Sequence, residues 1–172
     1  MVTLRRIAAL IVMSRDAQGL FALLQKRGEW DYEKRQPESY PGGCQATASG
    51  GMEEEDDGDP EATMRREVWQ ELGGTFASLV ISAKPEFLAS IPMPNMNRRA
   101  TFYWVEMPEE DLAKIALHPS SGGLVRFRQG MEMRDMYAEF SRAEGITDRR
   151  VIAAYPELKL ALARAFVVAT KP

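Results

Sequence analysis

The alternation of apolar and polar positions divides the chain into segments typical of strands and of helices. Ile7 to Met13 is a β-branched and aliphatic run, and Leu20 to Leu24 follows it after the turn-like Asp16-Ala17-Gln18-Gly19. This pattern predicts two buried strands that form a hairpin. The polar stretch from Lys26 to Ser39 then predicts a loop.

Further apolar segments predict more strands along the chain. Cys44 to Ser49 alternates weakly and predicts a short strand that runs into a turn at Gly50-Gly51. Leu79 to Ile91 and Thr101 to Met107 flank a polar turn and predict an antiparallel pair. A last strand is predicted at Leu124 to Phe127.

Three segments carry helix signals. The clearest is Pro60 to Leu72, where Asp59 is a good N-cap, proline occupies the first helical position and Gly73-Gly74 follow as a stop. Pro108 to Leu117 and Pro156 to Val168 predict a short helix and a terminal helix, whereas Met131 to Phe140 is ambiguous. Strands and helices are therefore mixed, and residues 1–172 predict one α/β domain without repeats or linkers.

Composition limits the chemistry that this domain can support. Its 172 residues include one cysteine, Cys44, and one histidine, His118, which excludes an internal disulfide and a zinc cluster of Cys and His ligands. A metal site would have to be made of oxygen. The net charge is −3, yet seven acids fall within the nine residues from Glu53 to Glu61, so the remainder is net positive.

No apolar run approaches the roughly 18 residues that a membrane span needs. The longest clean run is Ile7 to Met13, which Arg15-Asp16 ends without a cleavage site for a signal peptide. We therefore expect a cytoplasmic protein with no membrane partner.

Glu67 and Glu71 form an acidic pair on the predicted helix. Met64, Val68 and Leu72 mark the face that packs on the core, and the two glutamates lie side by side at its edge. Like charges four residues apart destabilise a helix unless a cation lies between them, and Arg65 and Arg66 point largely to other faces. Two explanations stay open here: a solvated acidic surface, or a site for a divalent cation such as Mg²⁺.

The segment around this pair resembles the Nudix box of Nudix hydrolases. Arg66-Glu67-Val68-Trp69-Gln70-Glu71-Leu72-Gly73 matches the second half of that motif at every position except one, and the box glycine is placed at Gly51. The predicted turn, acid loop, helix and flanking strands also suit the family's fold. The resemblance therefore implies a Nudix-like α/β/α sandwich with a mixed β-sheet.

The chain departs from the family pattern in two places. Gln70 stands where the motif has the first glutamate of a Glu-Glu pair. The loop between Gly51 and Arg66 is also one position longer than in the family, so Gly58 falls where a glutamate is expected. Asp57 or Asp59 could supply the loop acid, and the sequence does not decide between them.

The resemblance implies roles for individual residues. Glu67, Glu71 and the backbone carbonyl of Gly50 correspond to metal ligands for Mg²⁺, or for Mn²⁺, and Arg66 corresponds to the arginine that orients the acidic groups. Glu67 corresponds to a catalytic residue that could act as the base, and Glu132 is a candidate outside the box. The implied reaction is metal-dependent hydrolysis of a diphosphate linkage in a nucleoside diphosphate linked to another group, through attack of an activated water at phosphorus.

Two other functions remain as alternatives. One is a catalytically weak Nudix-like module that binds a nucleotide or diphosphate, and the other is an interaction protein whose acid run only solubilises a loop. A P-loop is excluded, because neither Gly42-Gly43 nor Gly50-Gly51 precedes Gly-Lys-Ser/Thr.

The expected partner is a small-molecule nucleotide or another diphosphate rather than a nucleic acid, and the oligomeric state stays open, a homodimer included. Candidate contacts to the substrate are surface arginines, which could meet a phosphate, and tryptophans, which could stack on a base: Arg98, Arg99, Arg126, Arg128, Trp30 and Trp104.

Overall fold

A computed structural model of the protein describes residues 3–141 and 151–171. The elements, in chain order, are β1 (Arg5–Asp16), β2 (Gly19–Arg27), β3 (Trp30–Asp31), β4 (Gln36–Pro37), β5 (Cys44–Gln45), β6 (Ala48–Gly51), η1 (Glu54–Asp56), α1 (Pro60–Leu72), α2 (Gly74–Ser82), β7 (Glu86–Met93), η2 (Pro94–Met96), β8 (Arg98–Glu106), η3 (Glu109–Lys114), β9 (Ser121–Phe127), β10 (Arg134–Asp135), α3 (Met136–Ser141), β11 (Ala153–Ala154) and α4 (Pro156–Ala169). The mixed α/β class predicted from the sequence is confirmed.

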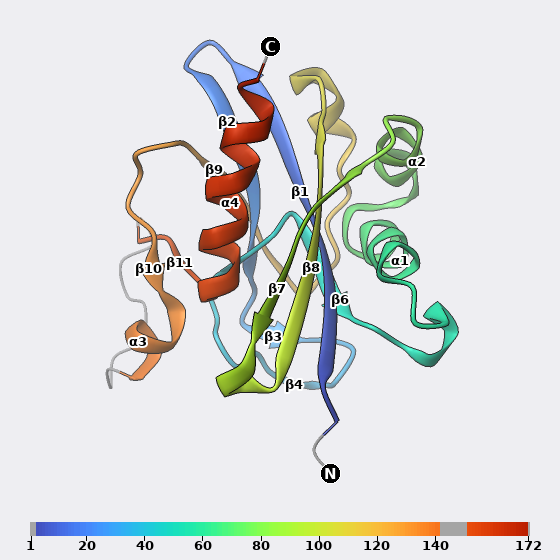
Figure 1. Ribbon diagram of the computed structural model, residues 1–172, viewed down its shortest axis with the longest axis vertical. Coiled ribbons are helices and arrows are strands. Elements are labelled where there is room, and N and C mark those ends of the chain that lie inside the picture. Colours follow the sequence, from blue (N-terminus) through green and yellow to red (C-terminus); the bar gives the residue numbers. More distant parts are fainter. Residues whose placement is uncertain (1–2, 142–150, 172) are drawn as a thin grey trace.

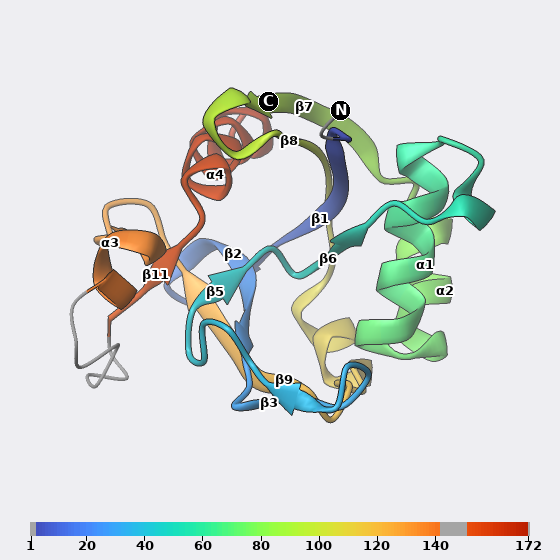
Figure 2. The same ribbon diagram turned by 90° about the horizontal axis from the view of Figure 1, so that it is seen from below.

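A curled mixed sheet separates the helices into two layers. Its strand order is β10-β11-β5-β2-β1-β8-β7, with β6 paired to β1 and β9 paired to β2. The central pair, β1 and β8, is parallel, whereas β1 and β2 form an antiparallel hairpin. Helices α1 and α2 lie together on one side of β1, and α4 lies on the other (Figures 1 and 2).

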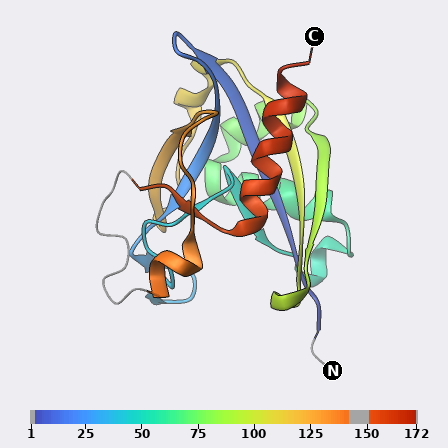
Figure 3. The same cartoon turned by 60° about the vertical axis from the view of Figure 1, so that its left-hand side comes forward.

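Strand β1 supplies both cores of the molecule. Its side chains alternate: Ala9, Ile11 and Met13 pack under α4, whereas Ala8, Leu10 and Val12 pack under α1 and α2. A strand covered on both faces needs apolar residues at every position, which explains the unbroken apolar run in the sequence. Figure 3 shows α4 lying along its face of the sheet.

Two predictions about the strands are wrong in detail. The segment from Leu79 to Ser82 belongs to α2, because Phe76, Ala77 and Val80 bury one helical face against the core. Gly50 and Gly51 do not form a turn but belong to the short strand β6.

The sheet forks where β1 changes its partner. Residues Val12 to Asp16 of β1 pair with β2, whereas Ile7 to Leu10 pair with β6. At the fork, the buried Thr47 hydroxyl accepts a hydrogen bond from Val12 N (2.8 Å) and donates one to the Leu23 carbonyl. This single hydroxyl replaces the ladder bonds that the separated strands cannot make to each other.

We predict that Thr47→Val destabilises the fold. The substitution keeps the shape of the side chain but leaves Val12 N–H and the Leu23 carbonyl without a partner, a cost of about 2–4 kcal/mol. Urea denaturation measures the loss. Thr101→Val is the matched control and should cost less than about 1 kcal/mol, because within residues 3–141 and 151–171 its hydroxyl contacts only Ser90 Oγ, at 3.5 Å. Equal effects of the two substitutions would contradict the role of Thr47.

Candidate functional site

Helix α1 forms as its sequence predicts and carries the two glutamates. The Asp59 side chain caps it by accepting from Glu61 N (2.9 Å), Pro60 opens it, and Gly73, at a φ of 83°, ends it. Met64, Val68 and Leu72 are buried in the core below. The edge with Glu67 and Glu71 therefore faces strand β6.

Glu67 is nearly buried and lies directly against Gly50 of β6. Only 8% of the residue is exposed, and a Cβ added to Gly50 would collide with its carboxylate. Glycine at this position thus makes room for the carboxylate. Burial raises the pKa of Glu67, and the charge of Arg66 opposes that rise.

Glu71 lies one turn further along the helix and is held by two glutamines. Its Oε2 accepts hydrogen bonds from Gln25 Nε2 (2.8 Å) and Gln45 Nε2 (3.2 Å), and the backbone N–H of Ser49 also donates to the carboxylate. Burial, and then the neighbouring charge of Glu67, raise the pKa of Glu71 to about 8. The pair is therefore no solvated acidic surface.

Arg66 connects the acid loop to the pair of glutamates. Its Nη1 donates to Glu67 Oε1 (2.6 Å), and its Nη2 donates to the Gly51 carbonyl (2.8 Å). The prediction that Arg66 points away from the acidic pair is wrong, because the long side chain bends back along α1 toward β6. This contact holds one carboxylate oxygen of Glu67 in a defined position.

Among the acids of the loop, Asp56 binds Arg66 most closely. Its carboxylate accepts from Arg66 Nε (3.1 Å) and Nη2 (2.9 Å) and from the Thr63 hydroxyl (2.9 Å). Neither Asp57 nor Asp59, the two predicted candidates, occupies this place: Asp57 adopts a left-handed conformation at the end of η1, and Asp59 caps α1. Asp56 ends the turn η1 and lies two positions before Gly58, where the family motif has its glutamate.

Glu67 and Glu71 line a polar cleft with a volume of about 360 Å³. Residues from six separate segments line it, among them Arg5, Gln25, Gln45, Glu67, Gln70, Glu71 and His118. Sequence analysis missed Gln25, Gln45 and His118 as cleft residues. The polar Gln25 within the apolar strand β2 was the one available signal, since a buried amide needs a partner.

Other predicted candidates lie elsewhere. Glu132 is exposed and pairs with Arg134 (3.1 Å), so it is not placed to act as a base in the cleft. Arg126 and Arg128 pair with Asp16, and Arg99 contacts Ser90. Trp30 is exposed, and Trp104 packs against the core beneath α4. Arg98 is buried in a second cavity.

The residues of the site fit a hard divalent cation. Within residues 3–141 and 151–171, no group of three or more His, Cys, Asp and Glu side chains forms a metal cluster. Two carboxylates and backbone carbonyls are nevertheless the oxygen donors that Mg²⁺ takes when waters and phosphate complete its shell. Burial, and then the charge of Glu67, raise the pKa of Glu71, and a cation between the pair would favour the charged forms of both groups.

Comparison with known proteins identifies the fold. A family model described as NUDIX domain matches residues 4–141. A mutT/nudix family protein from Listeria innocua superimposes with a TM-score of 0.62 at 17% identity, covering 99% of this chain and 96% of that chain. No curated protein sequence matches the chain significantly.

Two further solved structures share the fold. An Ap4A hydrolase from C. elegans, in a binary complex, has a TM-score of 0.55 at 13% identity, with 96% of this chain and 98% of that chain covered. The NUDIX domain of Shewanella oneidensis NrtR, complexed with ADP ribose, has a TM-score of 0.55 at 14% identity over 99% and 90% of the two chains. At these identities the likeness establishes the fold alone. No helix in the described part of the chain is long and apolar enough to cross a membrane.

We predict that Asp56→Asn destabilises the protein by about 2–3 kcal/mol at pH 7, the range for hydrogen bonds to charged groups. Arg66 holds the pKa of Asp56 well below its usual range. A carboxylate with a lowered pKa stabilises the folded state above its unfolded pKa of about 4 and loses that contribution as the pH falls further. The difference between wild type and variant should therefore be constant near neutrality and shrink below about pH 4. Denaturation curves at several pH values measure it, and a difference that persists unchanged at pH 3 would contradict the assignment.

Proposed function

Because this chain belongs to the Nudix family, we propose that it is a divalent-metal-dependent hydrolase that cleaves the diphosphate linkage of a nucleoside diphosphate linked to another group. The observation that carries this proposal is the pair of desolvated carboxylates, one turn apart on α1, at the polar cleft. The ligand of the NrtR domain, ADP ribose, is a compound of this class and supports the choice.

Glu67, Glu71 and the Gly50 carbonyl are the proposed ligands of Mg²⁺, or of Mn²⁺. The neighbouring carbonyl of Gly51 is already bound to Arg66, which favours Gly50 as the backbone ligand. When bound, the cation would neutralise charge on the diphosphate, polarise phosphorus and lower the pKa of an attacking water.

The chain's own residues then prepare the site for the reaction. Arg66 donates to Glu67 Oε1, so Oε2 is the oxygen left to serve either as the ligand of the cation or as the base that accepts the proton of the attacking water. Gln25 and Gln45 fix the Glu71 carboxylate by hydrogen bonds to one oxygen. Arg5 and Lys26 also line the cleft, and their positive charges favour an anionic substrate.

A second candidate function follows from Gln70. This residue replaces a carboxylate of the family motif, and its exposed side chain accepts a weak hydrogen bond from Arg66 (3.4 Å). A site with one fewer charge could bind a nucleotide or diphosphate with little turnover. Calorimetry that detects tight binding of an intact ligand in Mg²⁺, without release of product, would favour this function over hydrolysis.

We expect wild-type protein to release a nucleoside monophosphate in the presence of Mg²⁺ from at least one member of a panel of nucleoside diphosphate esters and dinucleoside polyphosphates. Glu71→Gln should lower kcat/KM by at least about 100-fold, because even outer-shell partners of a metal contribute 10- to 100-fold. Equal activity of the two proteins would reject the assigned site, and absence of activity with the whole panel would reject hydrolysis.

We further predict that Gly50→Ala lowers activity about 100-fold, the scale of an ångström-sized displacement of a reacting group. The new Cβ would push the end of the flexible Glu67 side chain out of position, so the loss of stability should be small. Gly51→Ala is the matched control, since a Cβ there meets no atom within 4 Å. Hydrolysis rates and thermal unfolding of both variants provide the measurement. Similar rates for the two variants would contradict the close packing of Glu67 on Gly50.

A further inference from the structure

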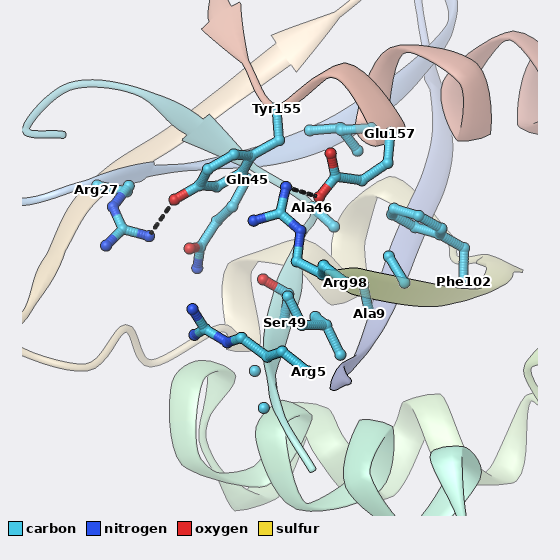
Figure 4. A pocket seen from close by; sticks show the side chains of 15 residues that line it. Arg5, Ala9, Arg27, Gln45, Ala46, Ser49, Arg98, Phe102, Tyr155 and Glu157 are labelled. Atoms are coloured by element: carbon cyan, nitrogen blue, oxygen red, sulfur yellow. Dashed lines mark hydrogen bonds and ion pairs between the residues drawn. The ribbon is translucent and has the colours of Figure 1, made fainter. Parts of the chain in front are cut away.

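A second, smaller cavity lies beneath the N-terminal end of α4 and is lined in part by residues of strand β6 (Figure 4). Its volume is about 120 Å³. It shares Arg5, Arg27, Gln45, Ser49, Gly50 and Gly51 with the larger cleft, so the two spaces are contiguous. A molecule held at the glutamates can therefore extend into this cavity.

Arg27, Arg98 and Glu157 line the cavity, and each has one buried side-chain atom without a hydrogen-bond partner among the described residues. Arg98 and Glu157 form an ion pair, and their side chains are only 9% and 5% exposed. Arg98 Nε, a donor, and Glu157 Oε2, an acceptor, have no hydrogen-bond partner among the described residues. Buried polar atoms without partners are rare and costly, which is a reason to expect that a ligand completes them.

The Arg98 side chain is held firmly in place. Its Nη1 donates to the Tyr137 hydroxyl (3.2 Å), and its guanidinium lies over the Tyr155 ring, 5.0 Å from the centroid. Tyr155 is itself fixed, because its hydroxyl accepts from Arg27 (3.2 Å). Arg98 Nε, the donor without a partner, therefore belongs to a side chain that its neighbours hold in position, as a binding site requires.

The size and walls of the cavity favour one flat ring. Phe102, Leu158 and three alanines supply apolar surface beside the polar pair. A cavity of about 150 Å³ binds benzene in another protein. The cavity here is slightly smaller, which suits a six-membered ring better than a fused two-ring system.

A second phosphate group is a poorer occupant. Arg98 is neutralised by Glu157, and Arg27 is neutralised by Glu38. The carboxylate of Glu157 would also repel an anion at this depth. Arg5 lies where the cavity and the cleft meet, a position suited to the phosphates rather than to the buried group.

We propose that this cavity is the base subsite of the substrate and takes a pyrimidine, the single-ring nucleobase. The edge of a nucleobase carries an N–H donor beside an acceptor, which can match the acceptor of Glu157 and the donor of Arg98, and the small volume of the cavity favours the single-ring pyrimidines over the purines. This inference rests on the proposed function and narrows its substrate class to pyrimidine nucleoside diphosphates linked to another group.

Binding of nucleoside monophosphates in the absence of a divalent cation tests the subsite separately from hydrolysis. Calorimetric titration of the wild-type protein with UMP, CMP, AMP and GMP in EDTA should give dissociation constants at least tenfold lower for a pyrimidine than for either purine. Equal affinities, tighter binding of a purine, or no binding of any of the four would overturn the proposal.

Glu157→Gln should weaken binding of the preferred pyrimidine nucleotide about tenfold, since an amide keeps one acceptor for Arg98 and replaces the free one with a donor. Glu86→Gln, at an exposed position on β7, is the control and should bind as wild type does. If Glu157→Gln does not fold, Ala46→Val provides the second test by filling part of the cavity without touching a charge. Unchanged pyrimidine affinity in the folded variant would overturn the proposal.

The two proposals fail in different ways. Pyrimidine-selective binding in a protein that hydrolyses nothing in Mg²⁺ would reject the hydrolase and keep the subsite. Hydrolysis that depends on Mg²⁺ and Glu71 but proceeds with equal kcat/KM for purine and pyrimidine substrates would keep the hydrolase and reject the subsite.

Discussion

The molecule depends on the satisfaction of backbone groups where β1 and β2 separate. Each edge of a strand can pair with one neighbour at a time, and the other edge of β1 is paired with β8, so β1 can accept β6 only where β2 moves away. The buried Thr47 hydroxyl makes this possible, because it bonds to both separated strands. The separation lets β6 enter the sheet beside α1 and brings Gly50 against Glu67. The same fork orients Gln25, whose amide donates both to the Thr47 carbonyl (2.9 Å) and to Glu71.

The charges of the site are balanced in sequence, from Asp56 to Arg66 and from Arg66 to Glu67. Asp56 neutralises most of the charge of Arg66, and Arg66 in turn opposes the desolvation of Glu67. Glu71 has no cation of its own within hydrogen-bonding distance among the described residues and is stabilised by amides instead. The carboxyl group without a compensating cation thus lies at the cleft, where its pKa is raised. A folded protein can keep such a desolvated acidic group only when the rest of the structure supplies the stability.

The features that the sequence predicted correctly are those that neighbouring residues determine. The bounds of α1 follow from Asp59, Pro60 and Gly73, and all three act as their residue types suggest. Helix α2 was missed because its apolar residues continue into those of β7, and a short apolar run does not distinguish a helix from a strand. Asp56 was missed because it lies two positions before Gly58, where the family motif has its glutamate. Gln25 and Gln45 meet Glu71 only through the pairing of distant strands, and Glu157 meets Arg98 across 59 positions of sequence, so no local pattern could have indicated them.

Strand β6 has a consequence for how the protein can change over evolution. Three of its residues line both the cleft that holds the glutamate pair and the cavity beneath α4. Ser49, Gly50 and Gly51 border both spaces, so a mutation there that alters one alters the other as well. The lining that α4 and β8 contribute borders the cavity but not the cleft, so mutations there can alter the cavity alone. In related chains we therefore expect the cavity to vary at positions on α4 and β8, while the residues of β6 stay small.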